Sequence, residues 1–349
     1  MKPMPIMQKV EQSIDISPIL GIQFPIIMAP MFLVSNKAMV KAGMKNGIMA
    51  TFPTLNYRKE GELEQVLADL NAAKSQDEFS SGNYGVNLIV QKSNPLYVKH
   101  LEACVEAKVP FYITSLGNPS EVIKKAHSYG AKVFCDVTNM KHAQKVLDLG
   151  CDGFIAVGAG AGGHAGPNAL HVLVERLSTA FPKVPVVAAG GIATGQSMLS
   201  MLSAGASGVS VGTRFIATTE ATVSEDYKDA IVKYDMDDIV LTEKISGTPC
   251  AVINTPYAKK IGYKQNWLEK ILSKNRTIRK YFKMLVQYRG MKWMEKSAKP
   301  GSYQTLWCAG QSVAMIDSKE SVEKIVQDFK NEFHQALNNM DYWKAPVEL

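Results

Sequence analysis

Residues 153–166 read Gly-Phe-Ile-Ala-Val-Gly-Ala-Gly-Ala-Gly-Gly-His-Ala-Gly, an apolar, strand-like run that passes directly into a glycine-rich segment. Glycine costs backbone entropy, so such a cluster indicates positive φ angles or positions where a ligand approaches bare backbone. His164, near the end of the run, carries the side chain whose charge changes close to neutral pH. The segment therefore predicts a strand that leads into a site for a flat anionic cofactor, with Gly162 and Gly163 against the cofactor and an imidazole beside it.

The composition is that of an ordinary globular protein, with 46% hydrophobic and 20% charged residues in a chain of 349. This length allows one large domain of about 250 residues with an appendage, or two ordinary domains. The five cysteines are scattered and contain no CxxC pair, which indicates reduced thiols in a cytoplasmic protein rather than a disulfide framework or a zinc site. The first twelve residues lack the apolar core of a signal peptide, and no run of about 18 apolar residues occurs, so we expect no membrane span.

The net charge of +7 is unevenly distributed. Residues 258–300 hold thirteen Lys or Arg and two Glu, a local excess of +11. Such a segment can bind nucleic acid or a membrane surface, but a solvated face of an amphipathic helix is the simpler interpretation. That interpretation predicts a buried stripe of Trp267, Leu268, Ile271, Leu272, Ile278, Tyr281, Phe282 and Leu285.

Short apolar runs alternate with amphipathic stretches along the first 235 residues. The predicted strands are 25–31, 48–52, 84–90, 111–115, 132–137, 153–157, 184–189 and 208–211. The predicted helices are 36–45, 61–74, 96–107, 120–129, 141–149, 170–181, 196–203 and 224–233. The strands are apolar on both faces, as in a parallel sheet that helices cover. Eight such units over roughly 210 residues predict a closed (β/α)₈ barrel.

A doubly wound open sheet is the alternative, because residues 158–163 also fit the G-x-G-x-x-G fingerprint of dinucleotide-binding folds. That match is weak, since it lies in the sixth unit and no acidic residue ends a strand some 20 residues later. The sequence therefore predicts an α/β TIM barrel over residues 1–235 and a C-terminal, largely helical extension over residues 236–349. Within the extension, residues 238–254 have the pattern of a hairpin and residues 318–337 that of an amphipathic helix. We expect the extension to pack on the barrel or cap it.

Polar and flexible residues occur where the predicted strands end. Pro30 and Met31 follow the first strand, Asn87 lies near the end of the third, and Asp136 lies near the end of the fifth. Reactive groups of a (β/α)₈ barrel lie at the carboxyl ends of its strands. We therefore expect these four residues at one mouth of the barrel, as candidates for binding a cofactor.

Two late turns have the features of a phosphate site. Gly190-Gly191 ends the seventh predicted strand, and Gly212-Thr213 ends the eighth. Barrels commonly bind phosphate at these two turns, through backbone N–H groups and a helix N-terminus. The alternative is that the glycines only form tight turns, but the occurrence of both turns together favours phosphate binding.

Among the six histidines, His164 is the candidate catalytic residue. His100, His127, His142 and His334 fall in helical patterns among charged neighbours, and we expect them at the surface. No second histidine or carboxylate lies at ligand spacing from His164, so we expect no metal site. A histidine flanked by glycines at a strand end instead favours general acid–base chemistry.

With these features the chain resembles the nitronate monooxygenase family of FMN-binding barrels. This family also includes NAD(P)H:quinone reductases and flavin-dependent enoyl-acyl-carrier-protein reductases. Ala309-Gly-Gln311, late in the chain, is similar as well. The resemblance otherwise rests on five segments, ordered and spaced as in the family: Pro25-Ile-Ile-Met-Ala-Pro-Met31, Gly85-Val-Asn87-Leu, Gly162-Gly-His-Ala-Gly166, Ala188-Ala-Gly-Gly-Ile192 and Gly208-Val-Ser-Val-Gly-Thr-Arg-Phe215.

The resemblance implies FMN as the cofactor and His164 as the base or hydrogen-bonding group beside the flavin. It also implies that Asn87 contacts the flavin ring, that Met31 packs near the ring, and that Gly162 lines the ring or the ribityl chain. The phosphate site that it implies consists of Gly191, Ser210, Val211, Gly212 and Thr213.

The activity implied in this way is the oxidation of alkyl nitronates or nitroalkanes through the flavin and O₂. The chain has Val157, Gly160 and Met28 where the family often has Gln, Glu and Gln, which weakens the assignment of this substrate. The form Ala161-Gly-Gly-His-Ala-Gly166, together with Ala309-Gly-Gln311, leans toward the alternative, an NAD(P)H:quinone or enoyl-thioester reductase with NAD(P)H as co-substrate. A third hypothesis is a non-enzymatic protein that binds FMN as a structural or sensing ligand and docks a partner through its basic segment. We expect a small-molecule substrate and no nucleic-acid partner, and leave the oligomeric state open.

Overall fold

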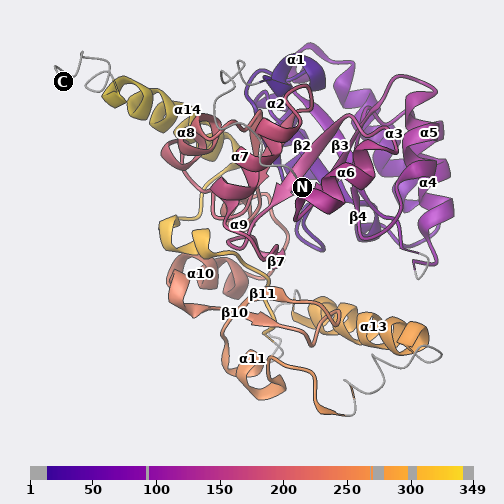
Figure 1. The fold of residues 1–349 in the computed structure, drawn as a ribbon, viewed down its shortest axis with the longest axis vertical. Coiled ribbons are helices and arrows are strands. Elements are labelled where there is room, and N and C mark those ends of the chain that lie inside the picture. The colour runs from indigo at the N-terminus through magenta and orange to yellow at the C-terminus, as the bar shows by residue number, and fades with distance from the viewer. Residues whose placement is uncertain (1–13, 92–93, 268, 270–278, 298–304, 341–349) are drawn as a thin grey trace, which may run out of the picture.

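The computed structural model describes residues 14–91, 94–267, 269, 279–297 and 305–340, and its centre is a closed parallel barrel (Figure 1). Among these residues, eight strands pair in the order β1-β2-β3-β4-β5-β6-β8-β9, and β9 pairs with β1 to close the ring. They are β1 (Ile26–Met28), β2 (Met49–Pro53), β3 (Asn83–Ile89), β4 (Phe111–Ser115), β5 (Lys132–Val137), β6 (Gly153–Val157), β8 (Val186–Ala189) and β9 (Gly208–Val211). The predicted α/β TIM barrel is confirmed, and the pairing of β1 with β9 excludes an open sheet.

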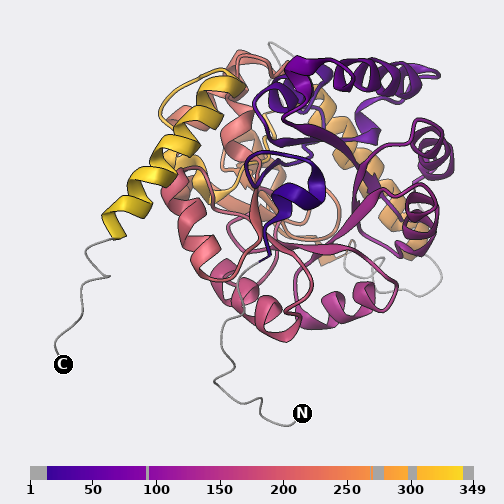
Figure 2. The ribbon, with the colours of Figure 1, turned by 90° about the horizontal axis from the view of Figure 1, so that it is seen from above.

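Helices follow the strands and surround the barrel (Figure 2). They are α2 (Lys37–Lys45), α3 (Glu62–Lys74), α4 (Tyr97–Glu106), α5 (Ser120–His127), α6 (Met140–Leu147), α7 (Leu170–Ala180), α8 (Gly195–Ser203), α9 (Thr213–Ile216) and α10 (Glu225–Lys233). Several helices begin at a residue whose side chain caps the first turn. The Asn36 side chain, for example, accepts a hydrogen bond from Met39 N, which satisfies one of the free N–H groups of α2. The predicted helices are confirmed to within two residues at each end. The short α9 was not predicted.

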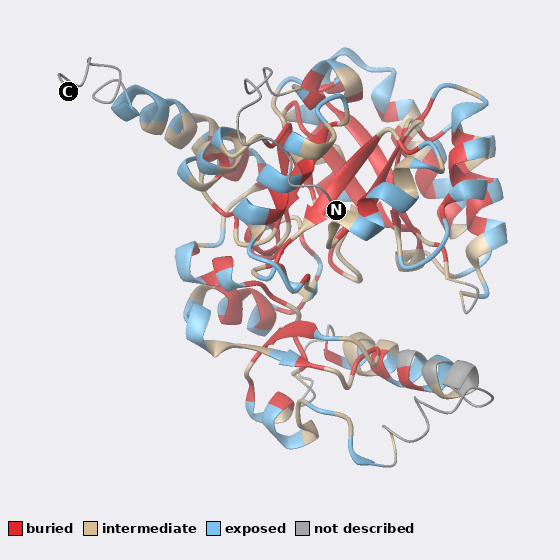
Figure 3. Ribbon diagram, viewed as in Figure 1, coloured by how far each residue is buried: buried red, intermediate tan, exposed pale blue. Residues whose placement is uncertain are grey.

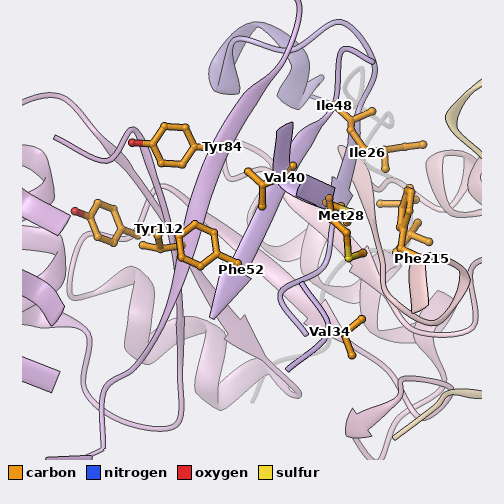
Figure 4. Packing of buried hydrophobic residues seen from close by; sticks show 14 of the residues in the cluster. Ile26, Met28, Val34, Val40, Ile48, Phe52, Tyr84, Tyr112 and Phe215 are labelled. Carbon is orange, nitrogen blue, oxygen red and sulfur yellow. The ribbon is translucent and has the colours of Figure 1, made fainter. Parts of the chain in front are cut away.

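Side-chain alternation along the strands creates two apolar layers. Inward-facing residues such as Ile27 and Ile113 form a cluster inside the barrel, and outward-facing residues form the larger cluster beneath the helices (Figure 4). The helix α1 (Ile16–Leu20), which the sequence did not predict, closes the amino end of the barrel, because Ile16 and Leu20 are buried in the interior cluster. Burial of both strand faces explains why the strands read as continuous apolar runs.

At the carboxyl end of the barrel, a three-stranded sheet joins the barrel to the extension. The strands β10 (Ile239–Thr242) and β11 (Cys250–Ile253) form the predicted antiparallel hairpin. The strand β11 also pairs with β7 (Gly163–His164), which lies in the loop after β6. The glycine-rich segment therefore contributes a strand to the sheet of the extension. The helices α11 (Pro256–Ile261) and α13 (Arg279–Ser297) follow in the part of the extension below the barrel in Figure 1.

The helix α14 (Val322–Asn339) returns to the wall of the barrel and lies against α8. Gly195 N donates to Glu332 Oε2 at 2.7 Å, and a Cβ on Gly195 would lie only 2.2 Å from Phe333 N. The two helices thus approach each other more closely than any larger residue at position 195 allows. The helix begins after Ser321, whose side chain accepts a hydrogen bond from Lys324 N, rather than at residue 318 as predicted.

Short 3₁₀ helices are η1 (Thr54–Asn56), η2 (Asp77–Phe79), η3 (Met236–Asp238) and η4 (Gln311–Met315).

The sequence predicted that eight apolar residues of the basic segment 258–300 form a buried stripe. This prediction is wrong for those of the eight that the structure describes. Trp267 is 68% exposed and Leu285 is 63% exposed, and Phe282 is half-buried. Figure 3 shows buried, intermediate and exposed stretches mixed along α13. The reason is that α13 does not segregate its apolar and basic residues onto opposite faces. Leu268, Ile271, Leu272, Ile278 and the side chain of Tyr281 lie outside the described residues.

His100, expected at the surface, is instead buried, with 4% of its area exposed. It lies on the inner face of α4 together with Leu101 and Cys104, and burial lowers the pKa of its imidazole.

Among the described residues, no helix combines the length and the apolar character needed to cross a membrane.

Candidate functional site

The interior of the barrel is polar at its carboxyl end. Asn87 and Ser115 lie on the same side of their strands as Ile113 of the interior cluster, near the ends of β3 and β4. Asn87 Nδ2 donates to Ser115 Oγ at 2.8 Å, and Ser115 Oγ donates to Asp136 Oδ2 at 2.5 Å. The structure thus brings together Asn87 and Asp136, both predicted from the strand ends, through Ser115.

The orientation of the Asn87 amide is fixed by its partners. Asn87 Nδ2 also donates to the backbone oxygen of Ile113 at 3.2 Å, and a carbonyl can only accept, so this side of the amide must be the nitrogen. Ser115 gives its hydroxyl proton to Asp136 and can therefore only accept from Asn87. None of the described residues donates to Asn87 Oδ1, so this oxygen is available to an N–H or O–H donor of a ligand.

Burial raises the pKa of the Asp136 carboxyl to about 6, and the hydrogen bond from Ser115 offsets part of this effect. Below its unfolded pKa this carboxyl is neutral in both the folded and the unfolded state. As the pH rises through the folded pKa, the folded protein must bear an ionised carboxylate in a poorly solvated position. The contribution of Asp136 to stability is therefore favourable in acid and is lost between about pH 4 and about pH 6.

We expect the Asp136→Asn variant to be more stable than the parent protein at about pH 8, by about 1–3 kcal/mol in the free energy of unfolding. The asparagine keeps a hydrogen-bonding partner for Ser115 but cannot ionise. Urea denaturation of both proteins at about pH 4 and about pH 8 measures the difference, which should be close to zero at the lower pH. A difference that does not change with pH would contradict the raised pKa.

Two glycines of the predicted site pack against the backbone of the protein itself. A Cβ on Gly162 would lie 2.8 Å from Gly310 N, and a Cβ on Gly190 would lie 2.8 Å from Ala161 N. These distances are shorter than van der Waals contact, so both positions require glycine whether or not a ligand is bound. The sequence did not predict these contacts: it related Gly162 to the cofactor, and Gly190 to a phosphate or a tight turn.

Two other glycines leave their backbone open. Gly163 and Gly191 have φ angles of +67° and +72°, and a Cβ on either would meet no described atom within 4 Å. Glycine is the residue that adopts this left-handed conformation without strain. These two positions therefore fit the expectation that a ligand approaches bare backbone.

The predicted phosphate turns meet at the same end of the barrel. Thr213 Oγ1 accepts from Gly310 N at 3.0 Å, so its hydroxyl proton is free to be donated to an anion. Ser210 pairs with inward-facing Ile27 and lies on the inner side of β9. The Val211 side chain is fully buried in the outer apolar layer, so only its backbone can contact a ligand. Gly212 follows directly.

The loop after β1 carries Pro30 and Met31, which are both half-buried. Asn56 of η1 holds this loop: its Oδ1 accepts from Leu33 N at 2.8 Å, and its Nδ2 donates to Met31 O at 3.2 Å. Leu33 has a φ of +63°, which is uncommon outside glycine and is tolerated where surrounding contacts enforce it. Met31 Sδ lies 3.7 Å from the position of a Cβ on Gly212, so the first and last turns of the barrel are neighbours. Local sequence carried no signal for Asn56.

His164 lies on β7 at the same mouth, and its side chain is exposed. Its Nε2 is 2.7 Å from Ser246 Oγ, and Ser246 Oγ is 2.8 Å from Thr248 Oγ1. The extension thus supplies the hydroxyl that orients the imidazole. Sequence reasoning missed Ser246, since residues 246–249 read only as a hairpin turn. An imidazole held in this way can accept or donate a proton near neutral pH.

Comparisons with known proteins identify relatives of this chain. The family model described as nitronate monooxygenase matches residues 14–332. The "(3aS,4S,5R,7aS)-5-hydroxy-7a-methyl-1-oxo-octahydro-1H-indene-4-carboxyl-CoA dehydrogenase" of Rhodococcus jostii (strain RHA1) is 29% identical over 279 residues, which is 79% of this chain and 74% of that protein. A "Probable nitronate monooxygenase" of Staphylococcus aureus (strain MSSA476) is 30% identical over 172 residues, which is 46% of this chain and 48% of the relative.

The structure of FabK from Thermotoga maritima is also similar, with a TM-score of 0.80 and 28% sequence identity, over 94% of this chain and 98% of that one. The family model covers the barrel and most of the extension, including the Ser246 turn and Gly310. The chain therefore belongs to the nitronate monooxygenase family, whose members are flavin-dependent oxidoreductases.

Proposed function

We propose that this enzyme uses FMN at the carboxyl end of the barrel to oxidise alkyl nitronates, or nitroalkanes that His164 first deprotonates, with O₂ as the electron acceptor. One observation carries the proposal: an exposed imidazole, the acceptor oxygen of Asn87 and the open backbone of Gly191 lie at the same mouth of the barrel. The family model and the Staphylococcus relative support the substrate class.

The residues present fit FMN. The oxidised flavin ring has one N–H donor, on its pyrimidine edge, and Asn87 Oδ1 is an acceptor without a partner among the described residues. The phosphate would take N–H groups of the Gly191 and Gly212 turns and the hydroxyl of Thr213. Met31, beside Gly212, would pack on the ring or the ribityl chain. The bound flavin would accept the electrons of the substrate and pass them to oxygen.

His164 performs the proton chemistry in this proposal. A neutral nitroalkane carries an acidic hydrogen on the carbon that bears the nitro group, and a neutral imidazole near pH 7 can remove it. The resulting imidazolium would stabilise the adjacent nitronate anion. The hydroxyl of Ser246, 2.7 Å from Nε2, keeps the ring in place while the proton moves.

The visible spectrum of the purified protein, followed by anaerobic titration with propyl nitronate, NADH and NADPH, tests the proposal. We expect a flavin spectrum that bleaches with propyl nitronate and recovers when oxygen is admitted. A colourless protein that does not take up FMN would overturn the cofactor assignment. Bleaching by NADH or NADPH but not by nitronate would overturn the substrate assignment.

A second candidate function is oxidoreduction at a thioester with NAD(P)H as co-substrate. Two relatives, 29% and 27% identical to this chain, have names that end in carboxyl-CoA dehydrogenase, which favours a CoA thioester as the substrate. The same anaerobic titration separates the two candidates, because only this one requires rapid reduction of the flavin by NADH or NADPH.

The hydrogen bonds that join Asn87, Ser115 and Asp136 allow a further prediction about FMN binding. In Ser115→Ala, the Asn87 amide loses one of its two anchors, so its oxygen is less firmly directed at the ligand. Since one hydrogen bond contributes about 0.5–1.5 kcal/mol, we expect the Kd for FMN to rise about 2- to 12-fold. Quenching of FMN fluorescence measures the Kd.

The matched control is Thr114→Val on the same strand. Thr114 is buried on the opposite face of β4, where its hydroxyl donates to Cys135 Sγ at 3.1 Å. This variant should leave the Kd for FMN unchanged. An equal loss of affinity in both variants would mean that disturbance of β4, and not the orientation of Asn87, is responsible.

A further inference from the structure

Two of the five cysteines lie side by side at the junction between the extension and the glycine run. Cys250 Sγ and Cys308 Sγ are 3.9 Å apart. Cys250 is paired with His164 across β11 and β7. Cys308 bridges to Val252 and precedes Ala309-Gly310, the segment that packs on Gly162. Both thiols are free in the structure.

The two thiols differ in access to solvent. Cys250 is only 2% exposed, whereas Cys308 is half-buried and lines a cavity of about 30 Å³ together with Phe32, Met294 and Trp307. A space of this size accommodates a molecule about as large as water. Such a space admits hydrogen peroxide far more readily than a bulky disulfide such as oxidised glutathione.

The local hydrogen bond also distinguishes the two thiols. The contact between the two sulfur atoms lowers the pKa of the Cys308 thiol, although burial opposes this effect. The same interaction, together with burial, raises the pKa of Cys250. The thiolate is the nucleophilic form of cysteine, and Cys308 is the thiol of the pair that lines the cavity, so Cys308 is the sulfur that peroxide reaches first.

We propose that Cys250 and Cys308 form a reactive dithiol site for small hydroperoxides, which oxidise it reversibly to an intramolecular disulfide. The Cys308 thiolate attacks one oxygen of hydrogen peroxide, the O–O bond breaks, and a sulfenic acid and hydroxide form. The sulfur of Cys250 then attacks Cys308, the S–O bond breaks, and the oxygen leaves as water. In total, two thiols lose two electrons and two protons, and one peroxide becomes two waters.

Closing this disulfide moves the segment that packs on the glycine run. The sulfur atoms must approach from 3.9 Å to about 2.05 Å. We expect this approach to shift Cys308 toward Cys250, and with it the adjoining Ala309-Gly310 segment that packs on Gly162. Because the partner strand β7 carries His164, oxidation disturbs the mouth of the barrel from two sides.

Thiol counting and peptide mapping test the proposal without relying on catalytic activity. After brief treatment with hydrogen peroxide, we expect the denatured protein to show three free thiols in place of five, with a disulfide-linked peptide pair that contains Cys250 and Cys308. Dithiothreitol should restore all five thiols, and oxidised glutathione should react far more slowly. In Cys250→Ser, peroxide should instead leave a sulfenic acid on Cys308.

Cys135 and Cys151 provide the matched control. They are also neighbours, but both are buried in the outer layer of the barrel. The variant Cys151→Ser should lose two thiols to peroxide as the parent protein does, and Cys308→Ser should lose none. Unchanged thiols in the parent protein, or direct conversion of Cys308 to sulfinic acid without a disulfide, would overturn the proposal. In the active holoenzyme, disulfide formation should also lower turnover several-fold, and dithiothreitol should reverse the loss.

Discussion

In the His164→Gln variant, kcat/KM for a neutral nitroalkane should fall by about 10²–10⁴-fold, the range that general-base catalysis contributes. Oxidation of the pre-formed nitronate should fall far less, because that substrate has already lost the proton that the imidazole removes. Glutamine retains hydrogen-bonding groups on a side chain of similar length but cannot accept the proton. Steady-state oxygen consumption with both substrates measures the two effects, and the flavin spectrum confirms that FMN is retained.

The control for this prediction is Ser246→Ala. This variant keeps the imidazole and removes the hydroxyl 2.7 Å from Nε2. We expect a loss of up to about tenfold with the nitroalkane and a shifted pH profile, since one hydrogen bond contributes about 0.5–1.5 kcal/mol. An equal loss of activity on nitroalkane and nitronate in His164→Gln would contradict the role as a base and would indicate that His164 only positions the substrate.

The barrel could be predicted from sequence because its strands are buried on both faces. A run such as residues 153–157 must then be apolar throughout, and the amphipathic stretches between such runs must be helices. The same argument could not find α1, which is five residues long, or β7, which is two residues long. β7 exists because Gly163 and His164 pair with Ala251 and Cys250, more than eighty residues later.

The sequence could predict those residues of the candidate site that lie at the carboxyl ends of strands, but not the residues that other parts of the fold bring to them. The rule that barrel chemistry lies at carboxyl ends selected Asn87 and Asp136, and the structure connects them. It could not select Ser246, which reaches His164 from the extension. Nor could the sequence separate Gly162, which accommodates Gly310, from Gly191, which faces open space, because both positions read simply as glycine.

The basic segment shows why helical spacing was a poor guide there. The predicted stripe assumed that residues 258–300 form an amphipathic helix with one buried face. In α13, Val286 is buried while Leu285 and Tyr288 are mostly exposed, and Arg289 lies over the ring of Trp293 at 4.8 Å. Apolar and basic residues are therefore interleaved around this helix rather than divided between two faces.

Replacing Gly310 by alanine should lower the free energy of unfolding by about 2–6 kcal/mol, since overpacking costs about 1–3 kcal/mol and each of two lost hydrogen bonds about 0.5–1.5 kcal/mol. The backbone of Gly310, with φ −99° and ψ 172°, suits alanine, so the cost comes from the contacts of the new Cβ and not from backbone strain. The new Cβ would lie 2.5 Å from Gly160 O and 2.7 Å from Gly162 N. To relieve these contacts the segment must move, which weakens the hydrogen bonds from Gly310 N to Thr213 Oγ1 and from Gln311 N to Gly160 O.

Gly191→Ala is the matched comparison. We expect Gly191→Ala mainly to weaken FMN binding and Gly310→Ala mainly to lower the free energy of unfolding. A Cβ on Gly191 meets no atom of the described residues within 4 Å, so its cost is the left-handed strain of about 1–2 kcal/mol. That Cβ enters the space proposed for the phosphate, so the Kd for FMN should rise more than about tenfold, or about 1.4 kcal/mol. Gly310→Ala should lose stability even in the protein without FMN, as urea denaturation measures. If Gly310→Ala is as stable as the parent protein, the extension is not clamped to the glycine run, and the run is glycine-rich for the ligand alone.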